Sequence, residues 1–356
     1  MDAAIRRGDF ADHQSLVDTL LNEVFTEATA RAAILAPGYA ELWRQLRANT
    51  DGGKRFRPRL VMAVYDAFGG TDWHGVAHVA ASIELLHTAL IVHDDVIDRD
   101  FVRRGIPNVS GVYRDIAQTA GLSIPTAEHR GMGVGVIAGD LALATAFRLM
   151  RRASSEPAVC EQLLELLDRA VFDSAAGELI DVDFTVRAGV ASVDEIVHME
   201  RLKTAVYSFE IPLVAGALLA RADGPQAEVL GQIGTEIGIA YQVVDDLLGV
   251  FGDERLTGKT TLGDLREGKQ TALIAAAAET DAWDELQPYV GNPELGHDDL
   301  VRARELFERS GAKARAEALA AEHIARAEAL IDSSTLPLAL QLELRGLAQR
   351  AVERSR

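Results

Sequence analysis

The sequence predicts an all-α protein that forms a single domain over residues 1–356. Apolar residues recur at helical spacing in segment after segment, and no convincing run alternates polar and apolar residues between turn signals. Ten prolines in 356 residues leave room for long uninterrupted helices. The helix breakers at 69–70, 103–108 and 291–298 are short, and no low-complexity linker divides the chain.

The first helix is expected where Leu16, Leu20, Leu21 and Val24 form an apolar stripe on one face. Further helices are predicted over 41–47, 76–94, 159–184, 228–251 and 314–332. The last of these is rich in Ala, Glu and Arg, which favour the helical state intrinsically. The stretch 108–131 is ambiguous, and we expect it to be rich in loops.

The chain carries 36 Lys and Arg against 54 Asp and Glu, a formal net charge of −18. This acidity argues against a nucleic-acid partner, and no basic cluster is present to anchor the chain on an anionic membrane. Cys160 is the single cysteine, which excludes an intrachain disulfide and a cysteine-rich zinc site. The first residues lack the apolar core of a signal peptide, and the run from Ile211 to Ala220 covers about half a bilayer. We therefore expect a cytoplasmic protein without a transmembrane segment.

Two acidic pairs that follow strongly apolar helices are the main functional signal. Asp94 and Asp98 lie one helical turn apart on one face, with Asp95 beside them, and Asp245 and Asp246 form the second pair. Like charges repel, and the helix dipole disfavours anions at a C-terminal end, so a positive partner must compensate. Carboxylates without His or Cys partners suit Mg²⁺. The alternative, a solvated acidic helix face, is less favoured because both pairs follow apolar helices.

Basic residues indicate that an anionic ligand accompanies the metal. The segment GGKRFRP, residues 52–58, places three cations behind two glycines, whose backbone can approach an anion closely. Arginine offers a planar fork to phosphate oxygens, and lysine offers a point charge. Further basic residues after the acidic pairs or on a later helix are Arg103, Arg104, Lys203, Lys259 and Lys269.

Five motifs in this order resemble the trans-isoprenyl diphosphate synthase (polyprenyl synthetase) family, and bacterial geranylgeranyl and farnesyl diphosphate synthases in particular. They are GGKRFRP, DDVIDRDFVRRG, KT, YQVVDDLLGVFGD and GKTTLGDLREGK, which lie between residues 51 and 271. One such motif is weak, but five in the family's order are highly specific. The resemblance implies the isoprenoid synthase fold, an all-α bundle around a deep central cavity with the acidic segments facing across its mouth. It also implies a homodimer.

The resemblance implies a role for each motif residue. Contacts to isopentenyl diphosphate are expected from Lys54, Arg57, His87 and Arg104. Contacts to the allylic diphosphate are expected from Arg103, Lys203, Gln242, Lys259 and Lys269. Mg²⁺, as three ions, is expected on Asp94, Asp95, Asp98, Asp181, Asp245 and Asp246, with Asp264 in support. The candidate catalytic residues are Lys203, Thr204 and Gln242, and the Thr204 hydroxyl with the Lys203 carbonyl resembles the group that stabilises the carbocation.

Two positions depart from the family pattern. Glu178 stands where the family usually has glutamine, which leaves the role of that position open. Gly249 stands where the second acidic motif, Asp-Asp-x-x-Asp, usually ends in aspartate, and Asp253 cannot simply replace it. Because coordination in the family rests mainly on the first aspartate of this motif, we expect activity to survive.

The implied reaction is a head-to-tail condensation of isopentenyl diphosphate with dimethylallyl, geranyl or farnesyl diphosphate. Metal ions and basic side chains would meet the negative charge of the departing diphosphate and so promote C–O ionisation. The double bond of isopentenyl diphosphate would then attack the allylic cation, and a proton would be lost. A terpene cyclase is an alternative that leaves GGKRFRP unexplained. A non-catalytic synthase subunit is another, although it should have lost acidic residues that this chain keeps.

The expected product is geranylgeranyl diphosphate, with farnesyl or longer polyprenyl diphosphates as alternatives. In the family, aromatic residues four and five positions before the first aspartate stop growth at fifteen carbons, and here these positions hold Leu90 and Ala89. Ala89 predicts a cavity deeper than that of a farnesyl synthase. The side chains of Leu86 and Leu90 are still large enough to stop chain growth soon afterwards. Alternatively, Ala89 only packs against a neighbouring helix, and another residue sets the length.

Overall fold

The structure is a computed structural model that describes residues 10–51, 55–252 and 261–353. The chain divides into two compact units, Met1–Leu167 with Ala215–Ala222, and Asp168–Val214 with Asp223–Arg356. The first unit carries the acidic pair at 94–95 and the second carries the pair at 245–246. Each unit is described here by itself, and the expectation of a single domain stays a prediction.

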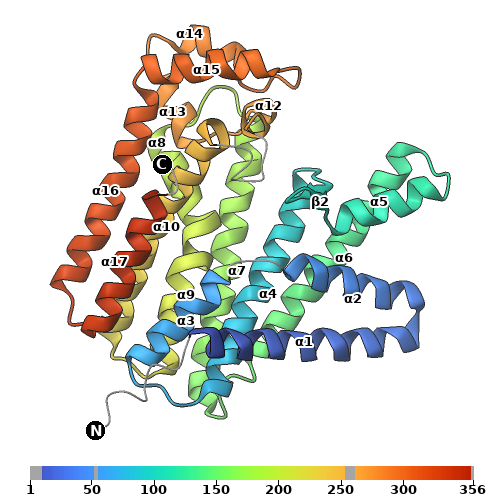
Figure 1. The fold of residues 1–356 in the computed structure, drawn as a ribbon, viewed down its shortest axis with the longest axis vertical. Helices are drawn as coiled ribbons and strands as arrows, with labels where there is room; N and C mark the ends of the chain where they lie inside the picture. Colours follow the sequence, from blue (N-terminus) through green and yellow to red (C-terminus); the bar gives the residue numbers. More distant parts are fainter. Residues whose placement is uncertain (1–9, 52–54, 253–260, 354–356) are drawn as a thin grey trace. The chain divides into compact units, whose positions relative to one another are not determined.

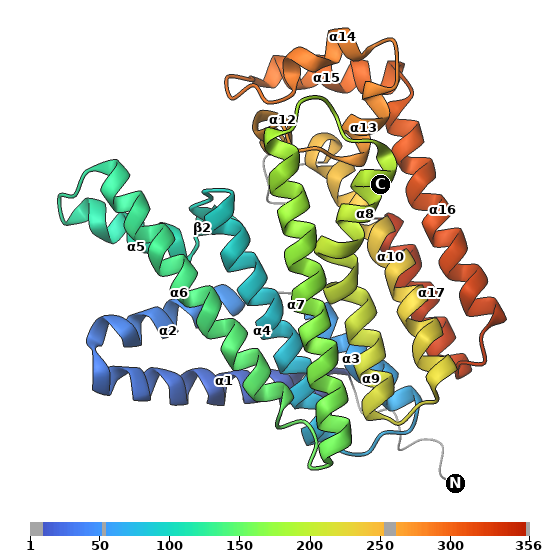
Figure 2. The ribbon, with the colours of Figure 1, turned by 180° about the vertical axis from the view of Figure 1, so that it is seen from behind.

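The first unit is helical apart from one short hairpin. Helix α4, the most deeply buried of its long helices, contributes Val79, Ile83 and Leu86 to the core with no exposed surface. Helices α4 and α6 lie side by side (Figures 1 and 2), joined where the Ser82 hydroxyl donates to the Ala146 carbonyl at 2.7 Å. The elements are α1 (Phe10–Leu35), α2 (Pro37–Thr50), α3 (Phe56–Ala67), α4 (Trp73–Ile97), β1 (Val102–Arg103), β2 (Ile106–Pro107), α5 (Val109–Thr119), α6 (Ile124–Met150) and the start of α7 (Pro157–Val186).

The stretch 108–131 is largely helical, so the expectation of a loop-rich segment was wrong. Asn108 caps helix α5, because its side-chain oxygen accepts a hydrogen bond from the Gly111 amide at 2.8 Å. Helix α6 begins at Ile124 with Pro125 in its first turn, where a missing amide hydrogen costs nothing. Helix α5 therefore combines an N-cap with an apolar face at helical spacing, on which Val109, Tyr113 and Ala117 are buried.

The second unit is built around helix α10, whose residues Ile233, Ile237 and Val244 are buried. A capping box between Asp223 and Gln226 starts this helix. Helices α16 and α17 run beside each other (Figures 1 and 2). Besides the rest of α7, the elements are α8 (Val193–Glu200), the π-helix η1 (Arg201–Glu210), the start of α9 (Ile211–Leu219), α10 (Gly224–Phe251), α12 (Gly263–Glu267), α13 (Ala272–Ala278), α14 (Trp283–Leu286), the 3₁₀ helix η2 (Gln287–Tyr289), α15 (His297–Arg309), α16 (Ala312–Ser333) and α17 (Leu338–Glu353). From Ala215 on, α9 belongs to the first unit.

The all-α prediction is confirmed. Each helix predicted from periodicity lies within an observed one, from α1 to α16. In the described residues the strands are limited to β1 and β2, which pair Val102 with Pro107 and Arg103 with Ile106.

Three helical segments are long and apolar enough to cross a membrane, judged by length and composition alone: Trp73–Ile97, Ile124–Met150 and Val193–Leu219. Counting only uninterrupted apolar runs misses such segments, because a single small or polar residue ends a run but lowers the mean hydropathy of an 18-residue window only slightly. In the first and third, 78% and 61% of the most apolar window is buried inside the structure, whereas in the second only 39% is buried. Core packing therefore accounts for most of the apolar surface of α4 and much less of that of α6.

Candidate active site

The first acidic segment occupies the last turn of α4. Asp94 and Asp95 are helical, and Asp98 caps the helix, its amide donating to the Asp94 carbonyl at 2.8 Å. The side chain of Asp94 is 27% exposed and Asp98 is exposed, whereas the side chain of Asp95 is 2% exposed. Asp94 and Asp98 are therefore open to a ligand from solvent, one turn apart as predicted, while Asp95 lies behind them.

Arg103 is held against this segment by a tight hairpin. The two turn residues, Arg104 and Gly105, both have positive φ, at 53° and 77°, as two-residue hairpin turns of type I′ require. The turn brings the Arg103 guanidinium to 2.6 Å from Asp95 Oδ1 and 3.3 Å from Asp94 Oδ2. Burial raises the pKa of Asp95 to about 6, although the Arg103 charge opposes the change.

The residues predicted to bind isopentenyl diphosphate gather around His87. Arg57 is 8% exposed, and its guanidinium lies over the Phe56 ring, 4.4 Å from the centroid. Burial and the nearby charges of Arg57, Arg103 and Arg104 hold the pKa of His87 well below its usual value. The imidazole is therefore neutral and offers one N–H donor to an anion. The fourth predicted contact, Lys54, lies outside the described residues.

Arg55, between Lys54 and Arg57 in the sequence, has a structural role. Its side chain is 6% exposed, and Nη1 donates to Glu84 Oε1 at 2.8 Å and to the Thr50 carbonyl at 2.9 Å. Nε donates to Asp18 at 3.2 Å. Arg55 therefore ties α1 and α4 to the start of α3 and is occupied within the protein.

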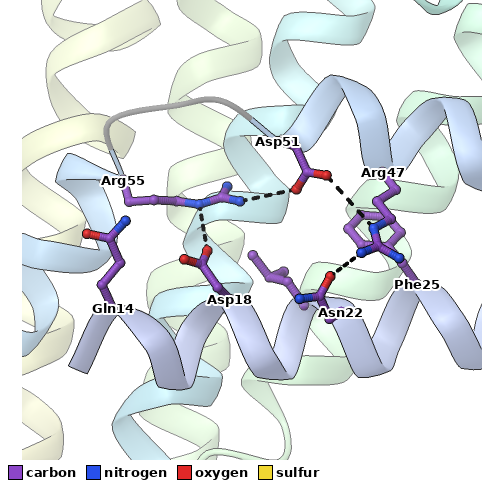
Figure 3. Close-up of a pocket in the computed structure, with 8 residues that line it drawn as sticks. Gln14, Asp18, Asn22, Phe25, Arg47, Asp51 and Arg55 are labelled. Carbon is purple, nitrogen blue, oxygen red and sulfur yellow. Dashed lines mark hydrogen bonds and ion pairs between the residues drawn. The ribbon is translucent and has the colours of Figure 1, made fainter. Parts of the chain in front are cut away.

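A pocket of about 430 Å³ lies beside Arg55, between α1 and the end of α2 (Figure 3). Its charged side chains pair across it: Asp51 lies 3.6 Å from the Arg55 guanidinium and 3.8 Å from that of Arg47. None of the predicted catalytic, substrate or metal residues lines it. The pocket is therefore separate from the acidic segment at 94–98.

The second acidic segment lies in the last third of α10. Gln242 donates from Nε2 to Asp246 Oδ1 at 2.9 Å, and Asp245 is half-buried beside them. Asp246 is 6% exposed. Burial raises its pKa to about 7; Lys269 opposes the change and the charge of Asp264 adds to it. Lys269 and Asp264 thus lie near this segment as predicted, whereas Lys259 is outside the described residues.

Lys203 lies between two carboxylates of α7. Its Nζ is 2.6 Å from Asp181 Oδ2 and 2.9 Å from Glu178 Oε2, so the unexpected glutamate at 178 forms an ion pair with it. Gly177 lets the backbone of η1 pack closely against α7, because a Cβ at position 177 would lie 2.2 Å from the Lys203 amide nitrogen. Lys203 and Thr204 both belong to the π-helix η1, a form often found at functional sites.

Glu200, which the sequence reasoning missed, is buried next to the second acidic segment. It is 1% exposed, and neither carboxyl oxygen has a hydrogen-bond donor in the described part of the chain. Burial and the charge of Asp246 raise the pKa of Glu200 well above the usual value, which favours the protonated form that donates a hydrogen bond to Asp246. A glutamate at the end of an amphipathic helix normally faces solvent, and no motif pointed to this one.

The carboxylates of both units fit Mg²⁺ by type. They are hard oxygen donors without sulfur, and the buried Oδ2 of Asp95 has no hydrogen-bond partner among the described residues. Within those residues, however, no three His, Cys, Asp or Glu side chains gather closely enough to hold a metal alone. This suits an ion bound through a few carboxylates, water and substrate phosphates. That the two segments face each other stays a prediction.

The residues predicted to set product length lie on the buried side of α4. Leu86 has no exposed surface, Ala89 is 1% exposed, and Leu90 is half-buried. Their role in chain length stays a prediction.

An all-α fold with two acidic segments, each near basic side chains, is the arrangement expected of an isoprenoid synthase. The polyprenyl synthetase family matches residues 40–306, and the chain belongs to this family. The family predicted from the five motifs is therefore confirmed.

Individual relatives differ in product length. The geranylgeranyl diphosphate synthase of Sulfolobus acidocaldarius is 31% identical over 73% of this chain and 74% of its own. The geranylfarnesyl diphosphate synthase of Aeropyrum pernix is 34% identical over 79% and 83%, and the (2E,6E)-farnesyl diphosphate synthase of Mycobacterium bovis is 32% identical over 86% and 81%. A crystal structure of geranylgeranyl pyrophosphate synthase from Corynebacterium glutamicum, complexed with isoprenyl diphosphate and magnesium, matches with a TM-score of 0.89 at 28% identity, over 97% of this chain and 99% of that one.

Proposed function

We propose that the protein is a prenyltransferase that condenses isopentenyl diphosphate with an allylic diphosphate, head to tail, and makes geranylgeranyl diphosphate. One observation carries the proposal: in each unit a basic side chain is bonded to acidic residues, Arg103 to Asp94 and Asp95, and Lys203 to Asp181. Each cation can exchange its carboxylate for a phosphate oxygen when a diphosphate arrives together with metal ions.

The grouping around His87 supports a site for the diphosphate of isopentenyl diphosphate. Arg57 and Arg104 bring positive charge to it, and neutral His87 adds an N–H donor without repelling them further. Lys54 completes the proposed set. A homoallylic substrate is held here without ionising, so this site needs charge complementarity and no metal.

The allylic diphosphate is proposed to bind Arg103, Lys203, Gln242, Lys259 and Lys269. Asp94, Asp98, Asp181 and Asp245, with Asp95 and Asp246, would hold Mg²⁺, proposed as three ions, which neutralise the charge of the leaving diphosphate when bound. Thr204 and the Lys203 carbonyl supply oxygen dipoles that favour a neighbouring allylic cation. The hydrogen bond from Gln242 keeps Asp246 in place beside Asp245.

A twenty-carbon product is proposed on the basis of Ala89. Relatives with products of fifteen, twenty and twenty-five carbons are all between 31% and 34% identical to the chain, so overall identity does not select the length. A small residue at 89 leaves more room for the growing prenyl chain along α4 than an aromatic ring would. The larger side chains of Leu86 and Leu90 limit this room. The allylic substrate used last is then farnesyl diphosphate.

A cytoplasmic homodimer without a membrane span is proposed as the working form. Helix α6 exposes Val136 and Ile137, at 44% and 52%, and α7 exposes Phe172, Leu179 and Val186 at 60% or more. Exposed apolar side chains that share one helix face, as Phe172, Leu179 and Val186 do at seven-residue spacing, favour an interface with another protein. A second copy of the chain is the proposed partner.

The test is an incubation of the purified protein with isopentenyl diphosphate, farnesyl diphosphate and Mg²⁺. Geranylgeranyl diphosphate as the main product supports the proposal. A hydrocarbon formed from farnesyl diphosphate without isopentenyl diphosphate identifies a terpene cyclase. No product from any allylic primer identifies a non-catalytic subunit and overturns the proposal.

A further inference from the structure

Arg55 has a backbone conformation that is strained for any residue with a side chain. Its φ of 49° and ψ of 33° lie in the left-handed region, immediately before α3. Its carbonyl accepts a hydrogen bond from the Arg59 amide at 3.1 Å, but its side chain does not cap the helix. Strain of this kind persists only where the surrounding structure enforces it, and it is concentrated at functional sites.

The partners that enforce this conformation lie on α1, on α4 and at the end of α2. Arg55 Nη1 donates to Glu84 Oε1 at 2.8 Å and to the Thr50 carbonyl at 2.9 Å, and the side chains of Arg55 and Glu84 are each 6% exposed. Asp18 accepts from Nε at 3.2 Å (Figure 3). One turn after Glu84, the Thr88 hydroxyl donates to Thr50 Oγ1 at 3.3 Å. A buried ion pair therefore fixes residue 55 against α4.

This ion pair joins two parts of the site proposed for isopentenyl diphosphate. Glu84 lies three residues before His87, so the two share one side of α4. Arg57 lies two residues after Arg55, in the first turn of α3, and is 8% exposed. Its charge helps to lower the pKa of His87. The ion pair therefore holds the start of α3, with Arg57, at a fixed place against the part of α4 that carries His87.

We infer that Arg55 and Glu84 are positioning residues for the isopentenyl diphosphate site. They act through their neighbours, because their buried ion pair keeps Arg57 and His87 in the arrangement that receives the diphosphate. This rests on the proposed function, which gives Arg57 and His87 their ligand. The alternative is that the pair only stabilises the fold. Apolar residues can often replace a buried ion pair without loss of stability, so stability alone is a weak reason for such a pair.

Three variants and a control separate positioning from stability. Arg55→Ala breaks the pair, and Glu84→Gln removes the negative charge but keeps an oxygen that accepts from Arg55. The paired variant, Arg55→Met with Glu84→Leu, removes one positive and one negative charge together, so the net charge is unchanged and no buried charge is left alone. Arg47→Ala is the control, because Arg47 lines the pocket beside Arg55 and is bonded to Asn22 of α1.

Isothermal titration calorimetry with isopentenyl diphosphate alone measures binding without turnover. Steady-state kinetics gives the KM for the allylic diphosphate, and circular dichroism melting measures stability. Together they distinguish a loss at one substrate site from damage to the whole fold.

Arg55→Ala should weaken the binding of isopentenyl diphosphate by about ten-fold or more, since a misplacement of about 1 Å can cost up to about 10²-fold. The paired variant should lose as much affinity, although it melts near the wild-type temperature. Glu84→Gln should melt at a lower temperature and yet bind almost as the wild type does, because the hydrogen bond to Arg55 remains. The KM for the allylic diphosphate should change little in each variant, and Arg47→Ala should bind as the wild type does.

Wild-type affinity in Arg55→Ala or in the folded paired variant would overturn the inference, and so would an equal loss of affinity for both substrates. If the paired variant does not fold, the comparison of Glu84→Gln with Arg55→Ala decides, because equal losses in these two would contradict positioning through the hydrogen bond. Each of these results leaves the proposed function intact. A wild-type protein that binds no isopentenyl diphosphate would overturn the proposed function as well.

Discussion

Lys203 Nζ lies 2.6 Å from Asp181 Oδ2, so the lysine proposed to bind the allylic diphosphate is already held in position by a carboxylate proposed to bind metal. Glu178 approaches the same nitrogen at 2.9 Å, which leaves the lysine between two negative charges. The close packing of Gly177 against the Lys203 backbone sets this geometry. A metal that draws Asp181 away would free Lys203 for a phosphate oxygen, so we expect binding of the metal and binding of the diphosphate to be coupled.

Replacing Lys203 by alanine should raise the KM for the allylic diphosphate by about ten-fold or more, because a charge-assisted contact to phosphate is lost. The KM for isopentenyl diphosphate should change little. Steady-state kinetics with each substrate varied in turn measures both. Lys313→Ala, which removes a partly exposed lysine paired with Glu308, is the matched control. An effect confined to isopentenyl diphosphate would contradict the proposed site.

Replacing Arg57 by alanine should affect isopentenyl diphosphate rather than the allylic diphosphate. The charge of Arg57 lowers the pKa of His87, and both belong to the group proposed to bind isopentenyl diphosphate. The KM for isopentenyl diphosphate should rise by roughly ten-fold or more. Arg59→Ala, two residues further along α3 and exposed, should leave both constants near their wild-type values. A variant that remains folded and loses only allylic affinity would show that the two sites have been exchanged.

Protonation of Glu236 should reduce stability in acid. Burial raises its pKa, but hydrogen bonds from His323 and Arg326 outweigh this and leave the pKa below its usual value. Because the pKa of Glu236 is lower in the folded state, ionised Glu236 contributes fully to stability above pH 4.5. This contribution is lost as the pH falls through the folded-state pKa. The free energy of unfolding of the wild type should exceed that of Glu236→Gln by about 1–3 kcal/mol at pH 7. This difference should narrow below pH 4.5.

Urea unfolding of both proteins at several pH values measures this gap. Glu308→Gln, which breaks the exposed pair with Lys313, is the control and should cost at most about 1 kcal/mol. A gap between wild type and Glu236→Gln that stays constant from pH 7 to pH 4 would contradict the assignment.

The helices and the acidic motifs were predictable because their signals are local. The spacing of Asp94 and Asp98 on one turn of α4 follows directly from helical geometry. The position of Asp264 over Gly249 was not predictable, because it depends on how a corner fifteen residues further along the chain folds back onto α10. Glu200 was missed for the same reason: its burial comes from tertiary packing and leaves no local trace.

The basic motif at 52–58 contains one arginine whose position could be predicted from the sequence and one whose position could not. Arg57 lies near His87 as the family resemblance implied. Arg55, which has the same chemistry and lies two residues earlier in the motif, turns inward to Glu84 instead. Its positive φ of 49° and its partners on α1 and α4 decide its direction, and neither can be read from the motif alone.

Ala89→Phe should shorten the main product to fifteen carbons. Ala89 is 1% exposed on the buried side of α4, so an aromatic ring there must take space from its neighbours. Chromatography of the dephosphorylated products gives the distribution. Ala81→Phe, on the same helix and also buried, is the control for overpacking. An active Ala89→Phe variant with unchanged products would show that another residue limits the chain.

The most direct test of the account is the Mg²⁺-dependent turnover of Asp94→Ala and Asp245→Ala, measured with isopentenyl and farnesyl diphosphates and compared with the exposed Asp281→Ala. The account predicts that the first two variants each lose about 10²-fold or more in turnover while they melt at the wild-type temperature, because each acidic segment helps to neutralise the leaving diphosphate. Asp281→Ala should behave as wild type. Near-normal turnover in a folded Asp94→Ala or Asp245→Ala variant would contradict the claim that both acidic segments act in prenyl transfer.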